Sequence, residues 1–256
     1  MTDRPAFRSW RSYWNFSREV SRRRRYIWSE ETKVFLDTVA ATVDKRIREL
    51  PPSKVFWRAQ LGHGWRFEDQ IDDDIPAAFE PKRMRPLADR AYEGRVNPKG
   101  IPCLYIATTK DSAMSEVRPG VGSLISVAQF KTTRALRLVD CSVHHASQKF
   151  YLEEPDADER EEAVWAQIDH AFADPVTRSD DTAGYAPTQL LAELFADLGY
   201  DGVVYKSAFG DDGFNIALFD LDAAEQLNCF LYRARKAVFE FTQEDNPYFI
   251  RKKSED

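Results

Sequence analysis

Residues 94–119 read GRVNPKGIPCLYIATTKDSAMSEVRP, and they predict a loop, a strand and a short helix in that order. Gly, Asn and Pro crowd the first seven positions, so the chain is expected to turn there before the apolar run 101–107 enters a sheet. Thr108 or Thr109 can then cap a short helix that ends before Pro119. The polar side chains of this compact stretch are typical of a functional site: Arg95, Asn97, Tyr105 and Glu116.

Two polar residues allow both a structural and a functional interpretation. A carboxylate near a helix C-terminus gains nothing from the helix dipole, so Glu116 is either a solvent-facing residue or a functional group in a cleft. Residues 54–60, KVFWRAQ, are rich in β-forming residues and place Arg58 among apolar neighbours. An arginine in such a strand either meets an anion or faces water from a sheet edge.

Two further strands are expected over residues 201–207 and 214–220, because both runs are apolar and rich in β-forming residues. The first run ends at Ser207, and the second carries Asn215. Ser126, in a strand expected over residues 123–131, is a rival for a functional serine.

These segments resemble the motifs of the RES domain family, which is named for its Arg, Glu and Ser. The family's first motif is a strand bearing an arginine, matched at Arg58, although Ala59 follows where some relatives have an aromatic residue. Its central segment, G-R-x-N-x-x-G-x-P-x-L-Y with a Glu-bearing helix after it, is matched by Gly94, Arg95, Asn97, Gly100, Pro102, Leu104, Tyr105, Ala113 and Glu116. Its last motif is matched by Gly199, Tyr200, Asp201, Gly202, Tyr205, Ser207, Gly213, Asn215 and Phe219.

The resemblance implies an α+β domain with an ADP-ribosyltransferase-like split β-sheet core, flanking helices and a cleft that binds NAD⁺ as substrate. It implies a toxin-type enzyme that cleaves the nicotinamide–ribose bond and depletes NAD⁺, without a metal, and that is usually paired with a helix-turn-helix antitoxin of the Xre type. The catalytic residues are then expected to be Arg58, Glu116 and Ser207. The NAD⁺-binding residues are expected to be Arg58, Arg95, Tyr105, Ser207 and Asn215.

The residue types suit this chemistry. Breaking the glycosidic bond builds positive charge on the ribose, which a carboxylate such as Glu116 can stabilise. A guanidinium fork matches pyrophosphate oxygens, which points to Arg58, with Arg95 as a second candidate. The remaining contacts, to the ribose, the amide or a phosphate, are expected from Tyr105, Ser207 and Asn215. Three acceptors stay open: water for a glycohydrolase, phosphate for a phosphorylase, and a macromolecule for an ADP-ribosyltransferase.

Composition and charge narrow the class of protein. The three cysteines have no metal-ligand spacing and are expected to be buried thiols in a reducing compartment, the cytoplasm. No apolar run is long enough for a membrane span or a secretion signal. Residues 1–25 carry eight Arg and two acids, whereas the whole chain has a net charge of −6. The acidic body argues against direct nucleic-acid binding. The basic arm either touches a phosphate backbone or an acidic partner surface, or it packs on the acidic body of its own chain. The alternative function is that of a non-catalytic binding protein with a degenerate cleft, in which this arm binds the partner.

The chain is expected to divide into a basic arm and helical extension over residues 1–50, a RES domain over 51–243 and a charged tail over 244–256. The apolar period of residues 29–50 predicts one helix closed by two prolines. Residues 61–93 are expected to be a long connection with little regular structure. His144 and His145 are expected to be a surface pair rather than metal ligands.

Overall fold

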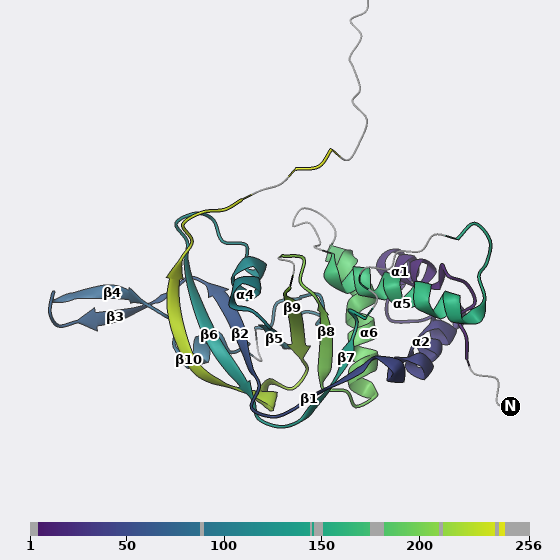
Figure 1. Cartoon of the computed structure of the whole chain (residues 1–256), viewed down its shortest axis with the longest axis horizontal. Helices are drawn as coiled ribbons and strands as arrows, with labels where there is room; N and C mark the ends of the chain where they lie inside the picture. The colour runs from purple at the N-terminus through teal and green to yellow at the C-terminus, as the bar shows by residue number, and fades with distance from the viewer. Residues whose placement is uncertain are drawn as a thin grey trace, which may run out of the picture.

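The computed structural model describes residues 5–87, 90–143, 145, 151–174, 182–209, 212–238 and 241–243. Its centre is an eight-stranded mixed sheet in the order β1-β7-β8-β9-β5-β2-β6-β10, with a separate two-stranded hairpin, β3-β4 (Figure 1). The sheet strands are β1 (Ile47–Leu50), β2 (Val55–Leu61), β5 (Leu104–Ala107), β6 (Leu124–Thr132), β7 (Leu136–Asp140), β8 (Gly202–Lys206), β9 (Phe214–Leu218) and β10 (Ala224–Arg233). The hairpin strands are β3 (Gly64–Glu68) and β4 (Asp73–Ala77).

The helices are α1 (Ser12–Arg22), α2 (Glu30–Thr42), α3 (Pro81–Met84), α4 (Lys110–Glu116), α5 (Ala157–Ala173) and α6 (Ala186–Asp197). Three short 3₁₀ turns, η1 (Val43–Arg46), η2 (Thr182–Tyr185) and η3 (Leu221–Ala223), join them to strands or helices. Of the described strand pairs only β7 and β8 are parallel, and α5 and α6 lie between them in the chain. A parallel pair needs such a crossover connection. The expected α+β class with flanking helices is confirmed.

The sheet is split where β2 meets β5. These two strands pair at the single register Trp57↔Ala107, whereas β2 and β6 pair along seven residues, from Val55 to Leu61. One half therefore holds β1, β7, β8, β9 and β5, and the other half holds β2, β6 and β10. The predicted split sheet is confirmed.

Alternation along β5 shows which face of the sheet carries which layer. Leu104 and Ile106 point into one buried cluster, which also contains Met84. Tyr105 packs against the large cluster under α1, α2, α5 and α6, and Ala107 lies in a smaller cluster with Ala113 of α4. Successive side chains of a strand point to opposite faces, so α4 and the other four helices cover the same face. Figure 1 shows α4 over one half of the sheet and the helical block over the other.

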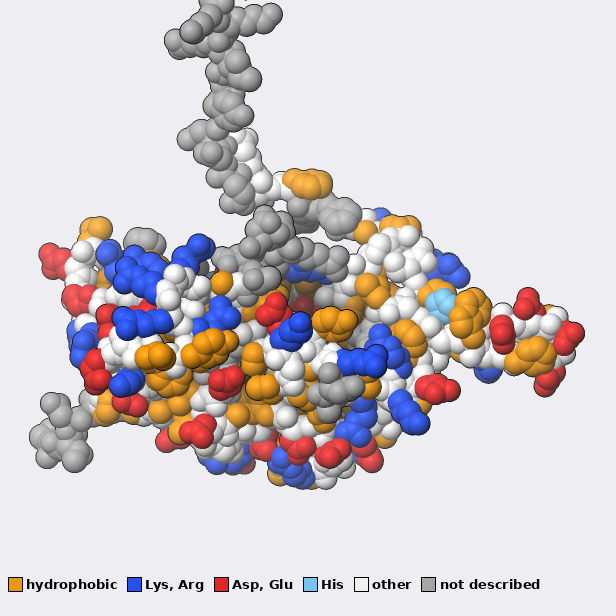
Figure 2. Space-filling view, turned by 180° about the vertical axis from the view of Figure 1, so that it is seen from behind, with side chains coloured by type: hydrophobic (Ala, Val, Ile, Leu, Met, Phe, Trp, Pro, Cys, Tyr) orange, Lys and Arg blue, Asp and Glu red, His pale blue; other side chains and the backbone are white. Residues whose placement is uncertain are grey.

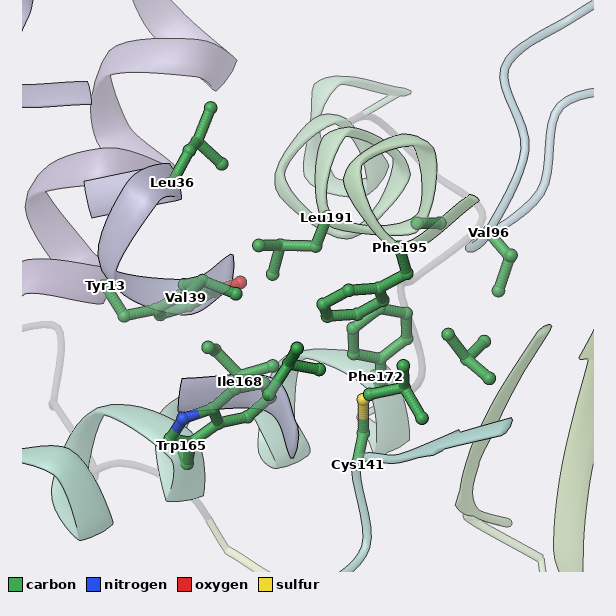
Figure 3. Packing of buried hydrophobic residues seen from close by; sticks show 14 of the residues in the cluster. Tyr13, Leu36, Val39, Val96, Cys141, Trp165, Ile168, Phe172, Leu191 and Phe195 are labelled. Atoms are coloured by element: carbon green, nitrogen blue, oxygen red, sulfur yellow. The ribbon is translucent and has the colours of Figure 1, made fainter. Parts of the chain in front are cut away.

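The largest core cluster joins the N-terminal helices to the rest of the chain. Figure 3 shows Tyr13 and Val39 of α1 and α2 beside Trp165 of α5, with Leu191 and Phe195 of α6 next to them. The indole Nε1 of Trp165 donates a hydrogen bond to Thr42 Oγ1 at 3.0 Å. The domain division at residue 50 stays a prediction, but the helices on its N-terminal side share one core with α5 and α6.

Two predictions about secondary structure are wrong. The helix expected over residues 29–50 ends at Thr42, because residues 47–50 pair with β7 as an edge strand. The apolar spacing at the end of this segment fits either structure, and the sheet pairing decides between them. Residues 61–93 are not a bare connection, since they contain the β3-β4 hairpin and α3. Their acidic and turn-forming composition concealed the alternating Trp65 and Phe67 of β3.

Two of the expected features, His144 and the tail 244–256, lie outside the described residues. His145 Nδ1 lies 3.0 Å from Oδ1 of the fully buried Asp169, so this histidine is anchored to the body. Within the described ranges, no helix has the length and apolar character needed to cross a membrane.

Phe16 tests the packing of α1 on the body. It is buried and its ring stacks on Phe35 with 4.5 Å between centroids and 20° between planes. Phe16→Ala is expected to lower the free energy of unfolding by about 3–5 kcal/mol, because it leaves a cavity in the core. The measurement is denaturant unfolding. Leu152→Ala, which truncates a fully exposed side chain, is the control and should change stability by less than about 0.5 kcal/mol. Equal effects of the two changes would contradict a packed α1.

Candidate active site

Helix α4 is positioned at the sheet by its N-terminal cap, Thr109, and by the glycine at position 213, which has no side chain to keep the helix away. Thr109 Oγ1 accepts a hydrogen bond from Ser112 N at 3.1 Å and so starts the helix, as predicted for a threonine at this point. A Cβ on Gly213 would collide with the side chain of Ser112, so only glycine allows the chain before β9 to approach α4 so closely. Glu116 is the last residue of this short helix.

Glu116 meets two polar residues from the neighbouring strands. Its Oε1 atom accepts hydrogen bonds from Ser207 Oγ at 2.8 Å and from Asn215 Nδ2 at 2.6 Å. Ser207 and Asn215 are buried, whereas Glu116 is exposed. No hydrogen bond to the second oxygen, Oε2, occurs among the described residues. The carboxylate is therefore held at one oxygen and open at the other, and three of the predicted site residues come together in one group.

Ser126, the rival serine, lies elsewhere. Its Oγ donates to Gly62 O at 2.9 Å and accepts from Phe79 N at 2.9 Å, so it braces the chain around the β3-β4 hairpin. It makes no contact with Glu116. Of the two serines, the structure brings only Ser207 to the carboxylate.

Tyr105 and Asn97 form the internal brace of the preceding loop. Tyr105 Oη donates to Asn97 Oδ1 at 2.7 Å and accepts from Val96 N at 3.0 Å, while Asn97 Nδ2 donates to Ile101 O at 2.7 Å. A Cβ on Gly94 would lie 2.6 Å from Tyr105 Oη, so the brace requires glycine there. Burial raises the pKa of Tyr105 well above its ordinary value. Its hydroxyl is thus a neutral group already used inside the protein, and its ring packs against the large core cluster.

Helix α6 fixes the same loop from the other side. Gln189 Nε2 donates to Gly94 O at 2.9 Å, and Thr188 Oγ1 donates to Arg95 O at 2.7 Å. The backbone around Arg95 is therefore held by side chains in the first turn of α6. This explains why the polar motif of residues 94–97 keeps a defined position although it has no regular secondary structure.

Arg95 points into an aromatic setting beside the Glu116 group. Its Nη1 donates to Ala171 O at 2.8 Å, and its guanidinium carbon lies 5.8 Å from the ring centroid of Tyr185 and 5.9 Å from that of Tyr205. Burial is the main cause that raises the pKa of Tyr205; the positive charge of Arg95 opposes this shift and the negative charge of Glu116 adds to it. Tyr205 therefore lies within the electrostatic reach of both charges. Tyr185 was missed by sequence reasoning, and only its position before a helix signalled it.

Arg58 is not part of this group. Its Nε donates to Met84 O at 2.7 Å and its Nη1 donates to Tyr105 O at 2.8 Å. Alternation along β2 places Arg58 on the face opposite to Trp57 and Ala59, which pack in the cluster under α4. Burial lowers the pKa of Arg58 to about 10. The guanidinium bridges β2 and β5 at the split in the sheet, and its expected role in binding a phosphate stays a prediction.

Arg118 is a cation at the site that sequence reasoning missed. It is exposed, follows Glu116 by two positions, and has a φ of 48°, a left-handed conformation that is uncommon for a residue with a side chain. Its guanidinium carbon lies 5.7 Å from the ring centroid of Phe209, whose N–H donates to Ser207 Oγ at 3.2 Å. The only signal in the sequence was its place inside the central motif.

The described residues contain no group of three or more His, Cys, Asp and Glu side chains placed to hold a metal ion. The site consists instead of one carboxylate, neutral hydroxyl and amide donors, two tyrosine rings and arginines. Such a set can bind a ligand that has anionic groups, hydroxyls and a flat ring, and it can stabilise positive charge that develops next to Glu116.

Comparison with known proteins identifies a family and a similar solved structure. The model of the family described as "RES domain" matches residues 55–237, well over half of the chain. No curated protein matches the sequence. A chain in the crystal structure of the M. tuberculosis MbcT–MbcA toxin–antitoxin complex is similar with 16% sequence identity and a TM-score of 0.44, over 75% of this chain and 90% of that chain.

Gly213 tests the approach of α4 to the sheet. Gly213→Ala is expected to force Ser112 away and to lower stability by about 1–3 kcal/mol, the usual cost of overpacking. Gly120→Ala is a matched control, because its Cβ would meet nothing nearer than Ser123 Oγ at 3.7 Å. Thermal unfolding of both variants measures the difference. A Gly213→Ala variant as stable as Gly120→Ala would show that the close approach is unnecessary.

Proposed function

Because the chain belongs to the RES domain family, we propose that it is an enzyme that cleaves the nicotinamide–ribose bond of NAD⁺. The observation that carries the proposal is the Glu116 carboxylate, held at Oε1 by Ser207 and Asn215 and open at Oε2. A surface glutamate without a role does not need two buried partners. The alternative of a degenerate, non-catalytic cleft has no comparable support, since the carboxylate and both of its donors are present together.

The proposed step is cleavage of the bond between the ribose C1 atom and the nicotinamide nitrogen. The bonding electron pair leaves with nicotinamide, which becomes neutral, and positive charge develops on the ribose. Glu116 stabilises this charge through the oxygen that is open in the structure. Ser207 and Asn215 hold the carboxylate before the reaction begins, so it does not have to reorganise as the charge forms. Water or phosphate then forms the new bond at C1, and attacking water releases one proton to solvent.

The same set of residues supports binding of the rest of NAD⁺. The guanidinium carbon of Arg95 lies 5.8 and 5.9 Å from the centroids of two tyrosine rings, a setting in which a flat ring can stack and a phosphate can pair with the guanidinium. Arg118, near Phe209, supplies a second cation. Arg58 stays a candidate through the N–H groups that do not bond Met84 O and Tyr105 O.

The acceptor decides the reaction class, and product analysis identifies it. Incubation with NAD⁺ should release nicotinamide, and mass spectrometry of the second product gives ADP-ribose for hydrolysis or ADP-ribose 1-phosphate for phosphorolysis. ADP-ribose found on a protein or nucleic acid would indicate the transferase alternative. No nicotinamide release with or without phosphate would reject the proposed activity.

We further propose a toxin role in the cytoplasm, with a helix-turn-helix antitoxin as partner and no metal, on the strength of the family alone.

Glu116→Gln separates the catalytic role from a structural one. The glutamine carbonyl can still accept both hydrogen bonds, so stability should change by less than about 0.5 kcal/mol. Nicotinamide release should fall by about a hundred- to a thousandfold, because the charge that stabilises the ribose is lost. Asp111→Asn, a carboxylate-to-amide change at an exposed position on the same helix, is the control and should keep its activity. Near wild-type turnover by a folded Glu116→Gln variant would remove Glu116 from the mechanism.

Lysine substitutions distinguish the arginines. Arg118→Lys should raise the KM for NAD⁺ by about tenfold, because an ammonium cannot reproduce a forked contact with phosphate, and should leave stability unchanged. Arg58→Lys should instead lower stability by about 1–3 kcal/mol, because lysine lacks the planar fork whose separate Nε and Nη1 atoms bond Met84 O and Tyr105 O. Arg66→Lys on the hairpin is the control for both measurements. An unchanged KM in Arg118→Lys would return the phosphate to Arg58 or Arg95.

A further inference from the structure

The β3-β4 hairpin projects from the sheet at one end of the molecule (Figure 1). Its strands pair only with each other, from Gly64↔Ala77 to Glu68↔Asp73. An isolated two-stranded hairpin is marginally stable in water. Trp65 and Phe67 lie two positions apart on one face of β3 and are 66% and 54% exposed. The hairpin thus offers an apolar face that the described residues do not cover.

The hairpin is also strongly acidic. Residues 64–77 contain one Arg and five Asp or Glu residues, a net charge of −4. In Figure 2 red side chains crowd the tip of the hairpin, next to orange hydrophobic ones. A surface that fits this face must be basic and must also carry exposed apolar side chains.

The turn between α1 and α2 has this character. Residues 22–28 read RRRRYIW, a net charge of +4, and Tyr26 and Ile27 are 89% and 77% exposed. The turn is ordered: Trp28 Nε1 donates to Arg25 O at 2.8 Å, and Ser29 caps α2. Figure 2 shows Lys and Arg side chains gathered over the helical end of the molecule, away from the hairpin. The two surfaces lie toward opposite ends, so they do not meet within one chain.

We propose that the β3-β4 hairpin of one copy docks on the turn of residues 22–28 of a second copy. The two segments have formal net charges of −4 and +4, with Arg24 of the turn already paired with Glu19 at 3.2 Å, and both surfaces expose aromatic rings. Arginines of the turn can pair with the hairpin carboxylates and lie over Trp65 or Phe67. The contact is head to tail, so each copy keeps one free surface of each kind, and repeated docking gives a ring or an open chain. Neither surface contains a residue of the candidate active site, so this inference does not depend on the proposed function.

The first test is the mass of the full-length protein in solution. Sedimentation velocity between about 1 and 100 µM, around an expected Kd on the order of 10 µM for a small interface, should show a mass that rises with concentration above the 29.5 kDa of one chain. High salt should reverse the rise, because it screens exposed charges. A protein that stays monomeric at the highest concentration in low salt overturns the proposal.

The second test uses complementary variants. Asp69→Lys with Asp74→Lys neutralises the hairpin, and Arg22→Glu with Arg23→Glu neutralises the turn; each variant alone should be monomeric. Mixed in equal amounts they should form a dimer and nothing larger, because one variant keeps an intact turn and the other an intact hairpin. Asp72 is left unchanged because its φ of 52° suits few other residues, and Asp73 because its Oδ1 accepts from Asp74 N.

Two controls complete this design. Lys82→Glu with Lys99→Glu makes the same change in net charge as the turn variant, at exposed positions elsewhere, and should associate as the wild type does. Trp65→Ser with Phe67→Ser removes the apolar face without changing the charge, and this variant should also be monomeric. It takes the place of the hairpin charge variant if that one folds poorly. A mixture that stays monomeric, or hairpin variants that associate normally, overturns the proposal. So does a monomeric wild type whose hairpin binds a different protein, since the surface then serves another partner.

Discussion

The carboxylate of Glu116 is the point at which three separate elements meet. It ends α4, and its Oε1 atom is bonded by Ser207 directly after β8 and by Asn215 in β9. The two donors come from neighbouring antiparallel strands, so the carboxylate is fixed in more than one direction. The contact needs α4 close to the sheet, and that approach depends on the absent side chain of Gly213. The two hydrogen bonds help to hold the end of a seven-residue helix that would not be stable alone.

The surroundings of this carboxylate favour neutral groups over further acids. Burial raises the pKa of both Tyr105 and Tyr205, so these tyrosines keep their hydroxyl protons near neutral pH and add no negative charge. Among the described residues, Arg95 lies near the ring of Tyr205, and Arg118 lies near the ring of Phe209, whose backbone N–H bonds Ser207. A single carboxylate among neutral and cationic groups suits a ligand that carries phosphates and becomes positively charged only at one atom during the reaction.

The sequence predicted which polar residues lie close together better than it predicted their individual contacts. Glu116, Ser207 and Asn215 were expected together from the family motifs, and the structure brings them within hydrogen-bond distance. Arg58 and Tyr105 were expected to bind a ligand. In the structure, Nε and Nη1 of Arg58 and the hydroxyl of Tyr105 bond other groups of the protein itself. A motif records which residue types occur and leaves open which face of a strand they occupy; for Arg58 that face depends on its register in β2. The end of α2 was missed for a similar reason, because residues 43–50 fit a helix until they pair with β7.

The helices outside the family match pack on the two helices that bond Arg95. The matched region begins at residue 55, so α1 and α2 lie before it. These helices pack on α5 and α6, and the same two helices hold Arg95: Ala171 O of α5 accepts from its guanidinium, and Thr188 of α6 bonds its carbonyl. A change in the packing of Phe16 or Trp165 is therefore expected to shift α5 and, through Ala171 O, the guanidinium of Arg95. The N-terminal segment, which in sequence looks like a separate basic arm, is in structure the support of the helical layer that carries Arg95.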